Sequence, residues 1–306
     1  MKKIVVLMST YNGELYLREQ IDSILSQKDI ELYLKVRDDG STDSTVEILN
    51  EYAQKGKLTF SMGENCGVGN SFMKLLYETE GQFDLYAFSD QDDIWLPNKL
   101  ICAAKKLQEQ KGPVLYASNQ RLVDGNGKYL GLRYMTPPSC DYHQILCANQ
   151  LSGCTMVFNR ELFLLLKDKK RRPTQELLRN RIHDVWVAMV ASISGSIFWD
   201  EESYILYRQH EKNVVGARKK GMKDRIAELN CKIREPGQRQ GRSRLAREIS
   251  NKFPEFIHNR CEDLFIYGYY NEKIGYKMKL LEDKSIRQFS HEAWWALYLK
   301  VMLHLF

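Results

Sequence analysis

The chain has 306 residues, of which 43% are hydrophobic and 27% are charged, so it can bury a sizeable core as one large domain or as a domain with an attachment. It contains no apolar stretch of about 18 or more residues, which excludes a predicted membrane-spanning helix. The seven cysteines are scattered and form no C-x-x-C pair. They indicate reduced thiols in a cytosolic protein, and neither a disulfide framework nor a zinc site.

The net charge of +6 is unevenly distributed. Residues 1–210 hold 25 Lys/Arg and 27 Asp/Glu, a net charge of −2, whereas residues 211–306 hold 20 and 12, a net charge of +8. The first part is therefore typical of a near-neutral enzyme body, and the second of a basic attachment with an anionic partner.

Up to about residue 120, apolar strand-like runs alternate with amphipathic helical patterns, which predicts an α/β sheet with parallel strands. The predicted strands are residues 4–8, 32–36, 58–61, 85–88 and 114–117. The predicted helices are residues 14–26, one that opens with the capping-box pattern from Ser44 to Glu47, one from about Val68, and one from Pro97 to about Gln110.

Beyond residue 120 this alternation fades, and turn signals stand at Asp124-Gly125-Asn126-Gly127 and at Pro137-Pro138. A mixed region follows up to about residue 207. From residue 211 to about residue 247 the composition becomes basic and polar, so a domain boundary is expected near residue 215.

Polar and acidic residues follow three of the predicted strands, at the strand ends where ligands gather in an open α/β sheet. The segments 38–41 and 89–93 contribute five carboxylates, which repel one another unless a cation or a donor-rich ligand lies between them. Mg²⁺ and Mn²⁺ prefer such oxygen ligands. The pattern Asp90-x-Asp92 is therefore a candidate metal site, and the alternative interpretation is that these acids only cap the following helix.

Three segments carry a resemblance to a known family: STYNGELYLREQIDSILSQ, VRDDGSTDSTVEIL and FSDQDDIWLPNKL. They cover most of the first 110 residues, and in order and spacing they resemble family 2 inverting glycosyltransferases. The resemblance implies an α/β GT-A (nucleotide-diphospho-sugar transferase) fold, with a mostly parallel central sheet flanked by helices. It also implies roles at the strand ends: Thr10 and Tyr11 with Asp38 or Asp39 at the nucleotide base, Asp90 near the ribose, and Asp92 on the Mn²⁺ or Mg²⁺ that bridges the diphosphate.

Two later segments also resemble this family. LSGCTMVFNREL, residues 151–162, is similar to its acceptor-side segment, where Gly153 permits close approach of a sugar; the alternative is a buried strand that enters a helix at Asn159. IHDVW, residues 182–186, lies where the family carries its catalytic base. The resemblance thus implies Asp184 as the base and Trp186 on the acceptor side, whereas His-Asp alone at a helix start is also typical of a cap.

An inverting transfer needs one carboxylate to take the proton of the acceptor hydroxyl. The metal offsets the charge on the departing diphosphate. Asp184 and Asp92 are thus expected to have different tasks, and no covalent intermediate is needed.

The segment YRQHEKNVVG, residues 207–216, resembles bacterial rhamnosyltransferases of cell-wall or capsular polysaccharide synthesis. This implies that His210 reaches the metal or the diphosphate and that dTDP-L-rhamnose is the donor. Arg208 can contact a phosphate as readily as an acidic side chain. Alternative donors are UDP-glucose and UDP-galactose. Other hypotheses are a sugar nucleotidyltransferase, whose glycine-rich phosphate loop is not matched by STYNGELYLREQ, and a non-catalytic binding scaffold.

Residues 212–247 hold twelve Lys/Arg against three acids, with almost no aromatic residue for base stacking, so anionic lipid is expected as the partner and nucleic acid is not. The tail, residues 293–306, is too short to cross a bilayer but rich in interfacial aromatic residues, with Trp294, Trp295 and Phe306 expected at the membrane. The alternative is that the tail packs on the enzyme body or in a homodimer.

The expected organisation is a GT-A catalytic domain over residues 1–215, with a nucleotide-sugar half up to residue 120 and an acceptor half after it. A basic helical C-terminal region follows over residues 216–306. The protein is expected to be cytoplasmic and peripheral on the inner face of the cell membrane, where it glycosylates a lipid-linked glycan.

Overall fold

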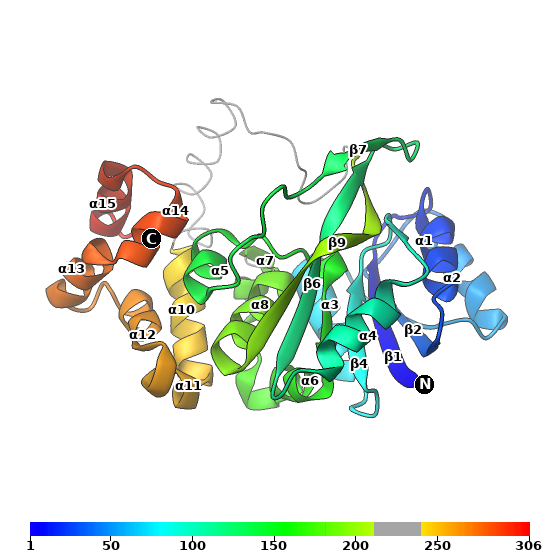
Figure 1. Ribbon diagram of the computed structural model, residues 1–306, viewed down its shortest axis with the longest axis horizontal. Helices are drawn as coiled ribbons and strands as arrows, with labels where there is room; N and C mark the ends of the chain where they lie inside the picture. Colours follow the sequence, from blue (N-terminus) through cyan, green and yellow to red (C-terminus); the bar gives the residue numbers. More distant parts are fainter. Residues whose placement is uncertain (181, 211–239) are drawn as a thin grey trace.

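A mixed, nine-stranded sheet forms the centre of the computed structural model, which describes residues 1–180, 182–210 and 240–306 (Figure 1). The strand order is β3-β2-β1-β4-β8-β6-β9-β5, and β7 pairs with β6 beside this path. The strands are β1 (Lys2–Thr10), β2 (Ile30–Asp38), β3 (Thr59–Met62), β4 (Leu85–Ser89), β5 (Ile94–Trp95), β6 (Val114–Val123), β7 (Tyr129–Leu132), β8 (Val157–Asn159) and β9 (Ser196–Arg208).

Helices cover both faces of this sheet and form the C-terminal end of the molecule (Figure 1). Those of the sheet-bearing part are α1 (Leu17–Leu25), α2 (Thr45–Gln54), α3 (Val68–Glu78), α4 (Lys99–Gln108), α5 (Tyr142–Ala148), α6 (Arg160–Lys167), α7 (Gln175–Asn180) and α8 (His183–Ser194), with short 3₁₀ turns at Gly153–Thr155 and Lys169–Arg171. The C-terminal helices are α10 (Gly241–Lys252), α11 (Pro254–Arg260), α12 (Glu262–Gly268), α13 (Ile274–Glu282), α14 (Lys284–Ser290) and α15 (Trp294–Met302).

The first half of the chain forms the parallel part of the sheet, as its alternating pattern predicts. β1 pairs in parallel with β2 and with β4, and β2 pairs in parallel with β3. Side chains of β1 alternate between the faces: Ile4 and Val6 join the core beneath α1, α2 and α4, while Val5 and Leu7 join the core beneath α3, α6 and α8. The carboxyl ends of β1, β2 and β4 therefore meet at one edge, where the polar segments lie.

The second half adds antiparallel strands that the sequence pattern did not reveal. β8 is inserted between β4 and β6 and is antiparallel to both. The long strand β6 runs parallel to β9 and turns back into β7. This hairpin confirms the predicted turn, since the Asp124 carboxylate accepts the backbone N–H groups of Asn126 and Lys128. The predicted helix start at Asn159 is also confirmed, because its side chain accepts the N–H of Leu162.

The predicted capping box at Ser44 is wrong in detail. Helix α2 does begin at Thr45, but Ser44 makes no side-chain cap. Asp43 accepts both the N–H and the hydroxyl of Thr45, while the N–H of Ser44 donates to Glu14 in the loop after β1. The helix start is thus fixed by a tertiary contact between two strand-end loops.

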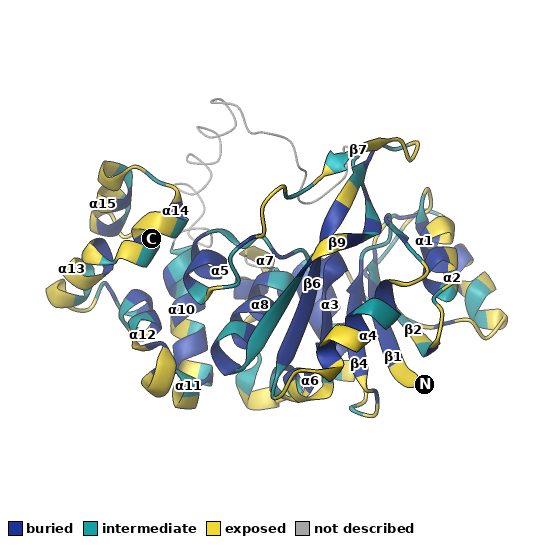
Figure 2. Ribbon diagram, in the orientation of Figure 1, coloured by how far each residue is buried: buried dark blue, intermediate teal, exposed yellow. Residues whose placement is uncertain are grey.

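The C-terminal helices share one hydrophobic core with the sheet-bearing part. Helices α10 and α11 pack against α8, and their buried residues join the same cluster as Trp186. Figure 2 shows this buried interior continuing from the strands through α8 into α10. The boundary expected near residue 215 lies outside the described residues.

The tail packs on the protein, which was the alternative interpretation. Phe306 is only 2% exposed and lies against the rings of Tyr267 and Tyr270, so the expectation that it enters a membrane is wrong. Its carbonyl also accepts hydrogen bonds from Ser243. Burial in the local core is the better environment for this ring because it combines apolar contact with a hydrogen-bonded carbonyl. Among the described residues, each helix is too short or too polar to span a bilayer.

Candidate active site

The loops after β1 and β2 are held together by Asp38. Its carboxylate accepts the Thr10 hydroxyl at 2.9 Å, the Ser41 hydroxyl and the backbone N–H groups of Gly40 and Ser41. Asp38 is fully buried and Thr10 is only 1% exposed. Both residues therefore shape the floor of the site instead of presenting free polar groups at its surface.

Asp39 is satisfied in the same way by a different set of donors. Its carboxylate accepts the Arg37 guanidinium at 2.5 Å and the backbone N–H groups of Cys66 and Gly67. Arg37 and Asp39 are both buried. Protein donors therefore satisfy two of the five strand-end carboxylates: neutral hydroxyl and N–H groups hold Asp38, and the Arg37 guanidinium pairs with Asp39.

Tyr11 is the exposed ring of this region, with 48% of the residue accessible. Its backbone N–H and carbonyl are both hydrogen-bonded by the Gln91 side chain, at 2.9 and 3.0 Å. A Cβ atom at Gly13 would lie 2.3 Å from the Gln91 side chain, so any larger residue there would displace the Gln91 amide. The loop after β1 is thereby fixed to the loop after β4.

Asp90, Asp92 and Asp93 gather at the end of β4, where Asp184 also approaches. Burial, with the neighbouring carboxylates of Asp92 and Asp184, raises the pKa of Asp90 to about 7. Burial and the same kind of repulsion raise the pKa of Asp93. One Asp93 oxygen accepts the N–H of Arg208, and the other has no hydrogen-bond partner among the described residues. The negative charge of this cluster is thus only partly balanced by hydrogen-bond donors and cations among the described residues.

Asp92 and His210, the two predicted metal ligands, are brought together. The Asp92 carboxylate lies 2.8 Å from Nε2 of His210, and both side chains are largely shielded from solvent. The His210 ring stacks on Tyr16, with ring centroids 5.3 Å apart. The segment directly after β9 therefore places the His210 imidazole beside the acids that follow β4.

Arg208 serves these same loops from a buried position. Its guanidinium donates to the carbonyls of Asp92 and Gly125 and pairs with Glu19 at 2.5 Å. It also lies over the Tyr16 ring. Only 3% of Arg208 is exposed. Of the two partners expected from the sequence, a phosphate or an acidic side chain, the structure shows the acidic side chain.

Gly153 and Asp184, predicted on the acceptor side and as the base, are neighbours. A Cβ atom at Gly153 would lie 3.5 Å from the Cβ atom of Asp184 and 2.5 Å from Nε2 of His183. His183 is buried between the rings of Phe72 and Phe88, and burial lowers its pKa to about 3. A neutral histidine thus anchors the start of α8, and Gly153 lets this ring pack closely against the turn before β8, beside Asp184.

Trp186 does not line the site, contrary to the expectation that it contacts the acceptor. Its side chain is fully buried and lies near Phe253 of the C-terminal part, with ring centroids 6.1 Å apart. Trp186 follows Asp184 by two positions on α8, so it points to a different side of the helix. The C-terminal helices provide the apolar environment that this indole occupies.

Several residues of the site were missed by the sequence interpretation. The Cys154 thiol accepts a hydrogen bond from Gln120 at 3.2 Å, and its sulfur can lie within 4.8 Å of ligand atoms of Asp90 and Asp93. Lys99 is fully buried over the Trp95 ring, and burial lowers its pKa to about 7. Asp93 could have been found from the sequence because it lies in the segment that directly follows a predicted strand. Lys99 could not, because nothing in the sequence distinguishes it from a lysine on a helix surface.

Arg133 was missed as well. Its guanidinium lies over the rings of Tyr134 and Tyr207, 5.6 and 5.4 Å from the ring centroids. Its hydrogen-bond partner is the Tyr134 hydroxyl, and no ion pair of Arg133 is found among the described residues. Burial raises the pKa of the Cys154 thiol, and the Arg133 charge acts in the opposite direction.

The acid cluster fits a hard divalent cation. The cluster offers more hydrogen-bond acceptors than the described residues offer donors. One Asp93 oxygen has no partner among the described residues, the pKa of Asp90 is raised, and the His210 imidazole lies beside Asp92. Carboxylate oxygens suit Mg²⁺ or Mn²⁺, whereas the thiol of Cys154 is a softer ligand. Acidic groups that can hold a metal are therefore present at the strand ends.

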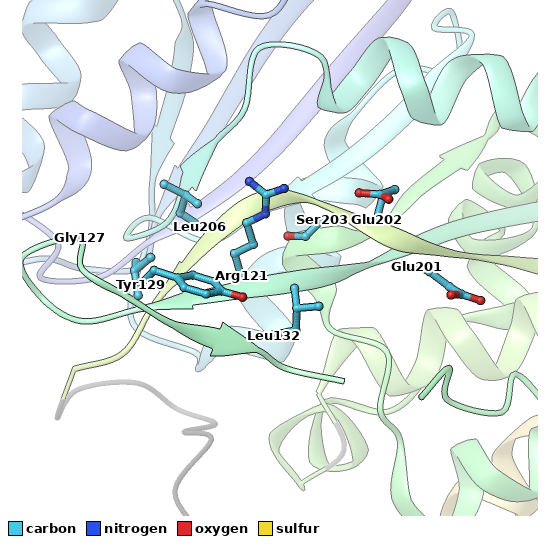
Figure 3. A pocket seen from close by; sticks show the side chains of 9 residues that line it. Arg121, Gly127, Tyr129, Leu132, Glu201, Glu202, Ser203 and Leu206 are labelled. Carbon is cyan, nitrogen blue, oxygen red and sulfur yellow. The ribbon is translucent and has the colours of Figure 1, made fainter. Parts of the chain in front are cut away.

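A cavity of about 510 Å³ lies elsewhere, under the β6–β7 hairpin (Figure 3). Arg121 of β6, Tyr129 and Leu132 of β7, and Glu201 and Glu202 of β9 line it. None of the predicted site residues lines this cavity, and both of its glutamates are exposed to solvent. The candidate active site at the strand ends is therefore separate from this cavity.

Comparisons with known proteins agree with this fold. The family model described as "Glycosyl transferase family 2" matches residues 5–164, which is just over half of the chain. The dTDP-rhamnosyl transferase RfbG of Shigella flexneri is 31% identical over 221 residues, covering 69% of this chain and 74% of that protein. An uncharacterized glycosyltransferase of Haemophilus influenzae is 29% identical and covers 55% of this chain and 66% of that protein.

Two solved structures share the fold. S. aureus TarS 1-349 in complex with UDP-GlcNAc superposes with a TM-score of 0.58 at 21% identity, covering 94% of this chain and 78% of that chain. The mannosyltransferase PcManGT from Pyrobaculum calidifontis, in complex with GDP-Man and Mn²⁺, has a TM-score of 0.51 at 14% identity, covering 99% and 86%. The predicted GT-A-type α/β architecture is thereby confirmed.

Proposed function

The chain belongs to glycosyl transferase family 2, and from this premise we propose that it transfers L-rhamnose, with inversion, from dTDP-L-rhamnose to a hydroxyl of a lipid-linked polysaccharide precursor. The observation that carries the proposal is the juxtaposition of Asp184 and the β4 acids beside Gly153. A carboxylate that can act as base and an anionic cluster suited to a metal are two parts that such a transfer needs.

In this proposal Asp184 takes the proton of the acceptor hydroxyl as that oxygen attacks the anomeric carbon. His183 positions Asp184, because its buried ring fixes the start of α8 between two phenylalanines. Gly153 lets the His183 ring and the start of α8 pack closely beside the turn before β8, which holds the base in place. The Tyr11 ring is the exposed surface against which the nucleotide base would stack.

Asp92 and His210 would hold Mn²⁺ or Mg²⁺, with Asp90 at the ribose. When bound, the metal would offset negative charge on the nucleoside diphosphate that departs. Arg208 positions Asp92 through its backbone carbonyl, and Arg133 is the nearby cation suited to an anionic group of a substrate.

The choice of L-rhamnose is supported by the similarity to RfbG. TarS was solved in complexes with UDP and with UDP-GlcNAc, which supports including UDP-sugars among the donors to test. UDP-glucose and UDP-galactose are accordingly the donors to compare. We further propose that the reaction takes place at the inner face of the cell membrane, where a lipid-linked acceptor is confined.

A donor panel tests the proposal. The protein is incubated with dTDP-L-rhamnose, UDP-glucose, UDP-galactose or UDP-GlcNAc, with Mn²⁺ or Mg²⁺, and release of nucleoside diphosphate is measured with and without membrane extract as acceptor. We expect release from dTDP-L-rhamnose that increases with acceptor. Absence of release from every donor under all conditions would contradict the proposed activity.

Asp184→Asn supplies the test of mechanism. It should lower turnover by roughly 100-fold or more while donor affinity is retained, because the amide is nearly isosteric but a far poorer base. Asp168→Asn is the matched control, since Asp168 is an exposed cap of the 3₁₀ turn after α6. Near-normal turnover of Asp184→Asn would assign the base to another residue.

A further inference from the structure

Helix α15 has one buried face and one exposed apolar face. Leu297 and Val301 point into the core and are almost fully buried. The exposed residues follow the helical spacing in two rows, and we call them the α15 stripe: Trp294, Trp295, Tyr298, Leu299, Met302 and Leu303. Trp294 is 55% exposed and Trp295 is 65% exposed, which are large values for tryptophan in a globular protein.

The neighbouring helix α13 extends this apolar surface. Its exposed residues Ile274 and Met278 are one turn apart, and α13 packs against α15. Both helices form the end of the molecule farthest from β3 (Figure 1), and their outer sides are exposed in Figure 2. The surface therefore lies apart from the strand-end site. An exposed surface made of several neighbouring large apolar side chains indicates an interaction site.

The charge around the stripe is positive. Residues 273–303 hold six Lys/Arg against three acids. Two of these acids are engaged within the protein: Asp283 accepts the Tyr267 hydroxyl, and Glu292 pairs with Arg242 and Lys300. The exposed Lys273, Lys279 and Lys284 have no ion pair among the described residues. The apolar stripe is thus accompanied by exposed cations that can pair with an anionic surface.

We propose that the α15 stripe, with the lysines of α13 and α14, docks on a bilayer surface that contains anionic lipid. Tryptophan and tyrosine favour the membrane–water interface, and lysine pairs with anionic headgroups. Helix α15 has nine residues, which suits a helix lying in the interface and is too short for spanning. A second copy of this chain is the less suitable occupant, because it would bring two lysine-rich surfaces together.

This inference rests on the proposed function only for its purpose, which is to hold the site near a lipid-linked acceptor. Its geometry depends on α13–α15 alone. Phe306 has a different task from the one that the sequence suggested, because its buried ring fixes the chain end beside α10 and α12.

Flotation with vesicles tests the docking surface. The full chain is mixed with vesicles of phosphatidylcholine alone or of phosphatidylcholine with phosphatidylglycerol, at low and high salt. We expect binding to the anionic vesicles, weakened by salt. Trp294→Ser with Trp295→Ser should weaken it by about tenfold or more, because interfacial binding scales with buried apolar area. Leu164→Ser is the matched control, since Leu164 is 50% exposed on α6, away from the stripe.

Two further variants separate the apolar and the electrostatic contributions. Trp294→Phe with Trp295→Phe should keep most of the binding while losing the quenching of tryptophan fluorescence by brominated lipid. Lys273→Glu with Lys279→Glu should weaken binding by about fivefold or more for each lysine that reaches the surface. Lys169→Glu with Lys170→Glu, two exposed lysines after α6, is the charge control and should leave binding unchanged.

Donor hydrolysis by the tryptophan-to-serine variant should equal that of the wild type, which also shows that the variant is folded. If the wild type ignores anionic vesicles, or binds them equally well after both serine substitutions, the inference is wrong. The inference is also wrong if the wild type is a dimer that does not bind vesicles and the two serine substitutions convert it to a monomer. Vesicle binding without any transferase activity would leave the docking surface standing and would refute the proposed function alone.

Discussion

His143 joins α5 to the C-terminal helices through two carboxylates. Its Nδ1 lies 2.6 Å from Asp141, and its Nε2 lies 2.6 Å from Asp263 of α12. The Tyr142 hydroxyl also donates to Asp263, and the Tyr267 hydroxyl donates to Asp263 and contacts Asp283. Cys261 is the remaining titratable neighbour of Asp263. A protonated His143 therefore bridges two parts of the chain that are 120 residues apart.

Burial alone would lower the pKa of His143, but the hydrogen bonds and charges of Asp141 and Asp263 outweigh it and raise the pKa from 6.5 to about 9. A difference of about 2.5 pH units corresponds to roughly 3 kcal/mol of stability. Because the folded-state pKa is raised, this stability is fully present below about pH 6.5 and is lost as the pH rises through about 9. The pKa values of Asp141 and Asp263 are lowered, so their own contribution is lost only in acid.

The perturbation that tests this is His143→Gln, which keeps hydrogen-bonding capacity but cannot carry a charge. Urea unfolding of the wild type and the variant is followed by circular dichroism at about pH 6 and about pH 9.5. The free energy of unfolding should differ by about 3 kcal/mol at the lower pH and by about 1 kcal/mol or less at the higher pH. His258→Gln, at an exposed histidine of α11, is the control and should show little difference at either pH. An equal difference between wild type and His143→Gln at both pH values would refute the charged bridge.

Three further outcomes are expected at the site. Chelation should abolish transfer, and Asp92→Ala should weaken donor and metal binding together in calorimetry, since metal and diphosphate bind jointly; equal donor affinity in EDTA would exclude metal dependence. Gly153→Ala should lower both turnover and the unfolding temperature because its Cβ atom would lie 2.5 Å from His183, and normal turnover would mean that His183 moves without consequence. Arg133→Gln should weaken binding of the diphosphate-bearing donor by about tenfold through loss of a charge-assisted contact, and unchanged donor affinity would assign Arg133 to another group.

The sequence by itself determined the parallel half of the fold and the position of the acids. The alternation of buried strands and amphipathic helices up to residue 120 is a local pattern, and β1 to β4 follow it closely. Carboxyl ends of adjacent parallel strands must meet at one edge, so Asp38 and Asp90 could be placed near one ligand site before any contact was known. The resemblance of the strand-end motifs then led to the family.

Only the tertiary structure decided how each of these side chains is satisfied. Arg37 is on β2 and Asp39 directly follows that strand, but the N–H groups that complete the hydrogen bonding of Asp39 come from Cys66 and Gly67. Cys154 reaches Asp93 because the short strand β8 enters the sheet between β4 and β6, a non-local pairing with no periodic signal. Contacts of this kind depend on chain crossings that hydrophobic periodicity does not encode.

The same reason explains the two aromatic residues that were misplaced. Trp186 was assigned to the acceptor by its place in a family motif, and Phe306 to the membrane because aromatic rings are common at the interface. The surroundings of neither ring could be predicted from neighbouring residues. The C-terminal helices bury both rings, whereas they leave Trp294 and Trp295 exposed. Sequence composition identified an aromatic tail, and packing alone decided which of its rings face solvent, because a short amphipathic helix can turn either row of side chains toward the core.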